Sequence, residues 1–299
     1  MCGIVGLHLK NSNLYTQLGE LLTPMLDRMT SRGPDSAGIA LYDAPLPEGA
    51  LRYSVRVGGS DAVEWDELAQ GLAAELGVEV TAEPRAGGAS LVAHGEAGPF
   101  LTALRALAPE VVLVGYGRAM EIYKDVGAPV EICDRYGVPK RSGYQGVGHT
   151  RMATESAVTT DGSHPFAPAA DLALVHNGSF SNYASVRRRL ARAGIRCETD
   201  NDSEVAARFI AHQMSLGADL EEALRLTLKE LDGFFTLLVT TATEFAVVRD
   251  SFACKPAVIA ETDDYVAMAS EYQALTGLPG IGDAEVFEPM PEEIHAWTR

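Results

Sequence analysis

The apolar positions near the start of the chain fall into two patterns. Residues 4–7 form a short apolar run, which is typical of a buried strand. Between residues 18 and 29, leucines and methionines recur at i, i+3, i+4, i+7 and i+8, which places them on one face of an amphipathic helix. The sequence Ser-Arg-Gly-Pro-Asp at residues 31–35 ends that helix, and residues 37–42 predict the next strand. The chain therefore opens with a strand, a helix and a second strand.

From residue 143 onward, the pattern predicts runs of strands with helices grouped between them. Strands are expected at residues 148–152, 172–176, 234–240, 245–249, 257–261 and 265–269. Helices are expected at residues 182–193, 203–214 and 220–231. Because the strands do not alternate strictly with helices, antiparallel pairing is favoured over a parallel sheet. The sequence thus predicts an α+β fold with antiparallel sheets and helices packed outside them.

A segment at about residues 44–141 separates these two blocks and has a pattern of its own. It opens with the linker Pro-Leu-Pro-Glu-Gly. Strands are expected at residues 51–57, 78–82 and 111–114, and helices at residues 65–76 and 100–107. We interpret this segment as a small α+β insertion that interrupts a single domain spanning residues 1–299.

Composition and charge exclude several function classes. The chain has a formal net charge of −17, which opposes binding to nucleic acid or to an anionic membrane surface. It has no uninterrupted apolar run of membrane-spanning length and no signal-peptide pattern at its start. The four cysteines, at residues 2, 133, 197 and 254, lack the spacing of a zinc site or a disulfide framework. We therefore expect a cytoplasmic protein without a metal or another cofactor.

Cys2 is the most informative single residue. A small second residue permits removal of the initiator Met, which would leave Cys2 with both a thiol and a free α-amine. An α-amine has a pKa of about 7.7–8.0, so it can accept the proton of the thiol near neutral pH. The position alone also allows a structural reading, in which Cys2 is a small apolar residue at the start of a strand.

Five short blocks resemble, in order, those of the class II glutamine amidotransferases. They are Cys-Gly-Ile-Val-Gly at residues 2–6 with Arg-Gly-Pro-Asp-Ser-Ala-Gly at 32–38, Gly-His-Thr-Arg-Met-Ala-Thr at 148–154, His-Asn-Gly at 176–178, Asp-Ser-Glu-Val at 202–205 and Met-Ala-Ser-Glu at 268–271. These are N-terminal-nucleophile enzymes that hydrolyse glutamine to glutamate and ammonia. The resemblance implies that reaction, and it implies a four-layer αββα sandwich with two antiparallel sheets.

The resemblance implies catalytic roles for four residues. Cys2 is the nucleophile, and the Asn177 side chain and the Gly178 backbone N–H stabilise the oxyanion that forms on the amide. Arg32 orders the loop over the nucleophile. An Asn-Gly pair is also typical of a hairpin turn, and the turn and the oxyanion role are compatible.

Four further residues are implied to bind glutamine. Arg151 offers a planar pair of donors for the substrate carboxylate, although a surface ion pair is the alternative. Asp202 pairs with the substrate ammonium or caps the following helix, and both roles are compatible. Thr154 and His164 are placed in the glutamine pocket, with a rigid His-Pro loop as the alternative for His164.

The resemblance also bears on partners. Only residues 272–299 follow the fifth block, which leaves no room for the acceptor domain of longer family members. The chain is similar to the separate amidotransferase subunits of glutamate-synthase-like and N-methylglutamate synthase complexes. We therefore expect a hetero-oligomer in which glutamine, or an N-alkylated glutamine, feeds a synthase subunit. A self-sufficient N-terminal-nucleophile amidohydrolase and a non-catalytic regulatory subunit remain alternatives.

Overall fold

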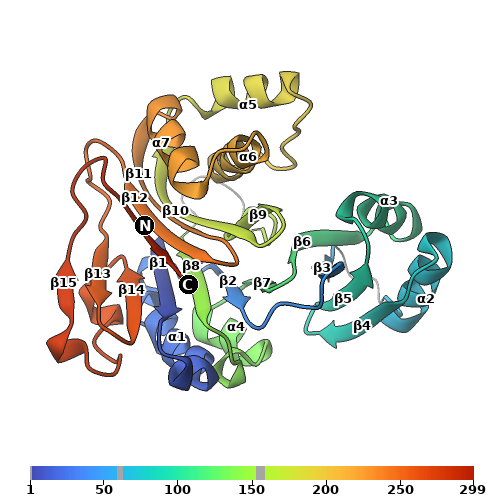
Figure 1. Cartoon of the computed structure of the whole chain (residues 1–299), viewed down its shortest axis with the longest axis horizontal. Coiled ribbons are helices and arrows are strands. Elements are labelled where there is room, and N and C mark those ends of the chain that lie inside the picture. The colour runs from blue at the N-terminus through green and yellow to red at the C-terminus, as the bar shows by residue number, and fades with distance from the viewer. Residues whose placement is uncertain (1, 59–62, 153–158) are drawn as a thin grey trace.

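The computed structural model describes residues 2–58, 63–152 and 159–299, which form two stacked sheets and a smaller unit beside them (Figure 1). Within these ranges, no helix combines the length and the apolar character needed to cross a membrane. Short 3₁₀ helices occur at Ser12–Gln17, Thr30–Arg32, Val138–Lys140, Tyr272–Ala274 and Ile281–Asp283.

The first sheet has seven strands in the order β15-β13-β14-β1-β8-β2-β7, and all of its pairs are antiparallel. Its strands are β1 (Gly3–Leu9), β2 (Ser36–Tyr42), β7 (Met120–Val126), β8 (Gln145–Arg151), β13 (Val258–Glu261), β14 (Tyr265–Ala269) and β15 (Glu285–Phe287). Helices α1 (Leu18–Asp27) and α4 (Pro129–Arg135) cover its outer face. Alternate β1 residues point to opposite faces, so Val5 and Leu7 pack against this helical layer.

The second sheet has five strands in the order β16-β12-β11-β10-β9, also antiparallel. Its strands are β9 (Phe166–Ala169), β10 (Leu172–Phe180), β11 (Gly233–Thr240), β12 (Glu244–Arg249) and β16 (Ile294–Thr298). Its outer face is covered by α5 (Tyr183–Arg192), α6 (Asp202–Ser215) and α7 (Leu220–Glu230). Leu174 of β10 and Ile210 of α6 meet in the core of this layer pair.

The two sheets pack face to face across a third apolar core. Ile4 and Val147 contribute to it from the first sheet, and Val175 and Leu238 from the second, all fully buried. Together with the two helical layers, this arrangement confirms the predicted αββα sandwich. The start of β1 and the end of β10, which carry the predicted nucleophile and oxyanion residues, belong to the facing sheets.

The inserted unit, which we define as β3 to β6, forms a separate sheet on the right in Figure 1. Its strands, β3 (Ala50–Val57), β4 (Val80–Arg85), β5 (Gly88–His94) and β6 (Val111–Gly117), pair in the order β4-β5-β3-β6. Helices α2 (Trp65–Leu76) and α3 (Ala97–Leu107) pack on it around a core of its own, in which Tyr53 stacks on Phe100 with ring centroids 3.7 Å apart.

The inserted unit is shorter than the segment of residues 44–141 expected from the sequence. β7 pairs with β2 from Ser36–Val126 to Tyr42–Met120, so it belongs to the seven-stranded sheet. α4 packs in the same layer as α1. Local patterning predicts a strand or a helix, but the sheet that a strand joins is set by long-range contacts that the pattern does not contain.

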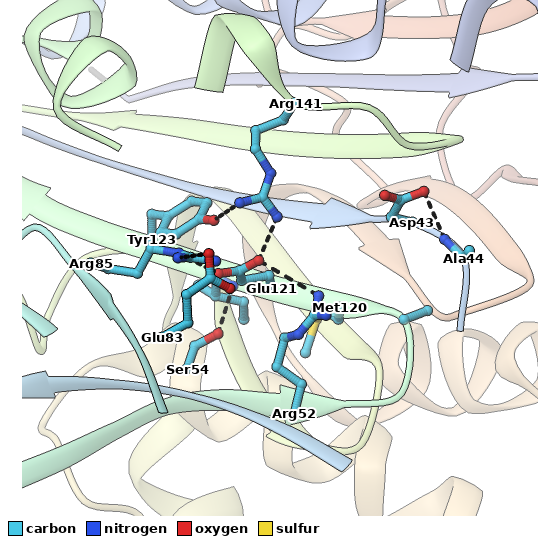
Figure 2. Close-up of polar contacts among 12 residues, drawn as sticks. Asp43, Ala44, Arg52, Ser54, Glu83, Arg85, Met120, Glu121, Tyr123 and Arg141 are labelled. Atoms are coloured by element: carbon cyan, nitrogen blue, oxygen red, sulfur yellow. Dashed lines mark hydrogen bonds and ion pairs between the residues drawn. The ribbon is translucent and has the colours of Figure 1, made fainter. Parts of the chain in front are cut away.

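A buried carboxylate connects the inserted unit to the sandwich. Glu121 of β7 accepts a hydrogen bond from Arg85 of β4 at 2.9 Å and pairs with Arg141 ahead of β8, as Figure 2 shows. Arg52 of β3 lies 3.6 Å from the same carboxylate. Burial raises the pKa of Glu121, but the three arginines outweigh it and hold the pKa below its usual range. The charged network therefore spans both units.

Candidate active site

Cys2 directly precedes β1 and is held by Arg32, which in turn is paired with Glu271. The Arg32 Nε donates to the Cys2 carbonyl at 3.1 Å, and the same guanidinium pairs with Glu271 at 2.6 Å. Next to Glu271, the Ser270 hydroxyl accepts from the Ile4 N–H at 3.0 Å, and the Ser270 N–H donates to the Ile4 carbonyl at 2.9 Å. The first and fifth sequence blocks are thus held side by side, and Arg32 contacts the predicted nucleophile directly.

The surroundings of the Cys2 thiol shift its pKa in opposite directions. Burial raises the pKa of the thiol, whereas a hydrogen bond with the Met152 backbone and the charges of Arg151 and Arg32 lower it. Burial is the largest of these, and the net shift is upward. The thiol therefore remains protonated near neutral pH and needs a base before it can act as a nucleophile.

Arg151 ends β8, the strand between β1 and β2, and a glycine turn supports it. A Cβ added at Gly33 would lie 2.4 Å from the Thr150 carbonyl carbon and 2.5 Å from the Arg151 nitrogen, so only glycine fits there. The Asp35 N–H donates to the Arg151 carbonyl at 3.1 Å. Residues 32–38 of the first block therefore fix the backbone of the predicted carboxylate-binding arginine, which lies in the second block.

Gly162 connects Arg151 to the residues around Asp202. A Cβ at Gly162 would lie 3.1 Å from the Arg151 Nη1, so the guanidinium packs against this glycine. The Gly162 carbonyl accepts from the Asn201 side chain at 3.1 Å. No pattern in the sequence indicates a role for Gly162.

Asp202 is the first residue of α6, and its predicted capping role is wrong. The N-cap is Asn201, whose side chain accepts from the Ser203 N–H at 2.9 Å. The Asp202 carboxylate instead accepts from the Phe180 N–H at 2.8 Å and from the Ser203 hydroxyl at 3.2 Å. It therefore connects α6 to the end of β10, two residues beyond Gly178.

Asn177 and Gly178 lie within β10, opposite Thr236 and Phe235 of β11, and form no hairpin turn. Gly178 has a φ of 149°, and a Cβ there would lie 1.9 Å from the Phe234 carbonyl oxygen, so glycine is required. The Asn177 side chain is buried, and its Nδ2 has no acceptor among the described residues. A buried donor without a partner is costly and is typical of a functional site.

His164 belongs to a buried cluster of three histidines. Its ring meets that of His149 edge to face with centroids 4.0 Å apart, and it lies 6.1 Å from that of His176. Burial lowers the pKa of His149 to about 3 and that of His176 to about 4, and it lowers the pKa of His164 well below its usual range. The three rings are therefore neutral at pH 7. The sequence analysis assigned only His164 to the glutamine pocket. Which histidines lie together depends on how the two sheets pack, and the sequence pattern does not contain that information.

The histidine cluster predicts a loss of stability in mild acid. Unfolded histidines have a pKa of about 6.5. The folded values are lower, so the unfolded state binds more protons as pH falls below 6.5, and folding is disfavoured. At pH 5, His149 and His176 each reduce the free energy of unfolding by about 2 kcal/mol relative to pH 7, and His164 acts in the same direction. Urea denaturation at both pH values measures the change, and equal midpoints contradict neutral buried rings.

Thr154 lies outside the described residues. Among the residues that are described, no group of three or more His, Cys, Asp or Glu side chains is arranged to hold a metal ion. The candidate site consists of a cysteine, an arginine, an aspartate, an asparagine–glycine pair and neutral histidines.

A family model described as a glutamine amidotransferase domain matches residues 149–277. The glutamine amidotransferase-like protein GlxB of Rhizobium meliloti (strain 1021) is 48% identical over 99% of this chain and 98% of its own length.

Two solved structures share the fold. The glutamine phosphoribosylpyrophosphate amidotransferase of B. subtilis superposes with a TM-score of 0.63 at 19% identity over 100% of this chain and 49% of its own chain. The allosteric regulatory enzyme of purine biosynthesis also gives a TM-score of 0.63, at 20% identity over 99% of this chain and 46% of its own. The chain thus spans about half the length of these two structures.

The αββα sandwich of this chain is the fold of these two solved structures. The chain belongs to the glutamine amidotransferase family and has glutamine amidotransferase activity.

Proposed function

We propose that the chain is the glutaminase subunit of a multisubunit amidotransferase, with Cys2 as its nucleophile. The observation that carries the proposal is the arrangement around β1, β8 and β10. Arg32 and Arg151 surround Cys2, and the buried Asn177 has a free Nδ2 donor on the facing sheet. A buried donor of this kind suits a charge that exists only during the reaction.

The reaction begins when the Cys2 α-amine takes the thiol proton. The thiolate attacks the carbonyl carbon of the glutamine side-chain amide, and the oxygen becomes an oxyanion stabilised by the Asn177 Nδ2–H and the Gly178 N–H. The protonated amine returns its proton to the departing nitrogen, which leaves as ammonia and gives a glutamyl thioester on Cys2. Water then hydrolyses the thioester, which releases glutamate and restores the thiol.

The remaining residues hold the substrate. Arg151 pairs with the glutamine carboxylate and Asp202 with its ammonium, on either side of Gly162. His164 forms a neutral wall of the pocket, and Thr154 contributes to the same pocket. Arg32 keeps the nucleophile in place through its bond to the Cys2 carbonyl. The same pocket accepts glutamine or an N-alkylated glutamine as amide donor.

The proposed partner is a synthase subunit of a glutamate-synthase-like or N-methylglutamate synthase-like complex. Ammonia released into water near neutral pH becomes ammonium, which is a poor nucleophile. A synthase subunit docked on the chain would receive the ammonia before it reaches water. The arginine-rich α5 offers a contact surface. Arg187 and Arg189 are ion-paired with Asp200 and Glu230, whereas the exposed Arg188 and Arg192 line a groove with Lys229 and Asp232.

Co-expression with neighbouring genes tests the partnership. We expect the chain to co-purify with a synthase subunit and to hydrolyse glutamine several-fold faster in the complex than alone. Arg188→Glu with Arg192→Glu is expected to weaken the complex, whereas Lys140→Glu, an exposed charge outside the α5 layer, is expected to leave it intact.

Other outcomes decide between the alternatives. A lone chain that is fully active and unaffected by any neighbour supports a self-sufficient amidohydrolase and contradicts the subunit proposal. A complex that forms without glutaminase activity supports a regulatory subunit.

A further inference from the structure

A cavity of about 290 Å³ lies between the inserted unit and the sandwich. On one side it is lined by α3 and β6, including Leu101, Val114 and Tyr116. On the other side lie Phe166 of β9, the segment that leads into α6, and α6 itself. The cavity therefore combines apolar and aromatic walls from two units of the fold, and none of the residues assigned to glutamine chemistry lines it.

The acidic residues that line this cavity are neutralised by arginines. Glu204 pairs with Arg208 at 2.6 Å and also accepts from the backbone N–H groups of Glu198 and Thr199 at 2.8 and 2.7 Å. Asp161 is ion-paired with Arg56, and Glu198 lies 3.5 Å from Arg105. Each of these three carboxylates is therefore already paired with an arginine.

Lys124 of β7 also lines the cavity and, unlike the arginines there, forms no ion pair with a described carboxylate. Its side chain is only 9% exposed, and its Nζ lies 4.8 Å from the centre of the Phe166 ring. Among the described residues, Lys124 has no hydrogen-bond acceptor and no carboxylate within ion-pair distance. Burial lowers the pKa of Lys124 to about 7, and the charges of Asp161, Arg56 and Glu204 act on it less strongly.

We propose that this cavity binds a small organic anion, a carboxylate on an aromatic or aliphatic body, with Lys124 as its counter-ion. A buried ammonium whose one close contact is an aromatic ring is unfavourable, and a bound carboxylate supplies the missing ion pair. The apolar walls take the body of the ligand, and Phe166 and Tyr116 provide aromatic contacts.

The position of the cavity ties it to the glutamine site. Its wall includes Thr199 and Glu204, which flank Asp202 in sequence, and Phe166, whose ring meets that of His164 with centroids 5.1 Å apart. A bound anion therefore touches both segments that carry the predicted substrate-binding residues.

Benzoate is the probe for a first test. Benzamide, which is neutral, and benzylamine, which is cationic, are comparison ligands of similar shape. Isothermal titration of the full chain is expected to show benzoate binding at least tenfold tighter than either. Lys124→Met is expected to weaken benzoate at least tenfold, whereas Lys140→Met and Arg151→Met are expected to retain it. The Arg151 variant separates this site from the glutamine site. Equal binding of benzoate and benzamide, retention by Lys124→Met, or loss in Arg151→Met overturns the proposal.

A second measurement uses the unmodified chain and is independent of whether Lys124→Met folds. Mild amine methylation followed by mass spectrometry reports the reactivity of each lysine. Benzoate is expected to slow modification of Lys124 at least several-fold and to leave the exposed Lys140 unchanged, while benzamide protects neither. Unchanged Lys124 reactivity in saturating benzoate rules out the assigned counter-ion.

Discussion

Cys2→Ala is expected to lower glutamine hydrolysis by a factor on the order of 10⁴ or more while the protein stays folded. The substitution removes the nucleophile, and the thioester route disappears with it. It removes a single sulfur atom from a residue that is only partly buried, so no large cavity is created. Glutamate release, measured on the chain with its partner and supported by an unchanged circular dichroism spectrum, tests the expectation.

The other cysteines provide the matched controls. Cys254 is exposed, and Cys133 is buried with its pKa raised to about 12 by burial. Cys254→Ala and Cys133→Ala are expected to keep glutaminase turnover near that of the unmodified protein. An electrophilic glutamine analogue such as a diazoketone is expected to label Cys2 alone. Normal turnover in Cys2→Ala contradicts the mechanism.

The state of the N-terminus separates two versions of that mechanism. Because burial raises the pKa of the Cys2 thiol, a base is required, and the free α-amine of Cys2 supplies it after Met1 is removed. Intact-mass spectrometry of active protein is expected to show the loss of one Met residue. Fully active protein that retains Met1 would leave Cys2 as the nucleophile but exclude its amine as the base.

Strong local patterns predicted the elements of the fold well. The amphipathic spacing predicted a helix at residues 65–76, and α2 spans Trp65–Leu76. Five strands were not predicted: β5 (Gly88–His94), β7 (Met120–Val126), β9 (Phe166–Ala169), β15 (Glu285–Phe287) and β16 (Ile294–Thr298). β9 is short and contains a proline, and β15 and β16 are edge strands without a buried residue, so none of these three has a clear alternating pattern.

The residues of the candidate site that lie in sequence motifs could be predicted. The contacts between those residues could not, because they depend on the tertiary fold. The blocks around Cys2 and Glu271 are predicted by resemblance, but the Arg32–Glu271 ion pair joins residues 239 positions apart. The sequence pattern also contains no signal that Lys124 of β7 lies beside Phe166 of β9, because the two strands belong to different sheets.

Asn177→Ala is expected to slow turnover by about 100–1000-fold with little change in KM. The Asn177 Nδ2 is buried without an acceptor among the described residues, so it is free to donate to an oxyanion. That charge exists in the transition state and not in bound glutamine, so the loss falls on kcat. Asp202→Asn provides the contrast, because the loss of an ion pair with the substrate ammonium is expected to raise KM first. Steady-state kinetics of both variants separate the two patterns.

Asn177→Asp distinguishes a missing donor from a disturbed strand. Aspartate matches asparagine in shape and keeps the packing of β10 against β11, but it replaces the donor with a negative oxygen beside the developing oxyanion. Its kcat is therefore expected to fall at least as far as that of Asn177→Ala, while the melting temperature of the alanine variant shows whether the strand is intact. If either variant raised KM and left kcat unchanged, Asn177 would be a substrate-binding residue, and the oxyanion would need another donor.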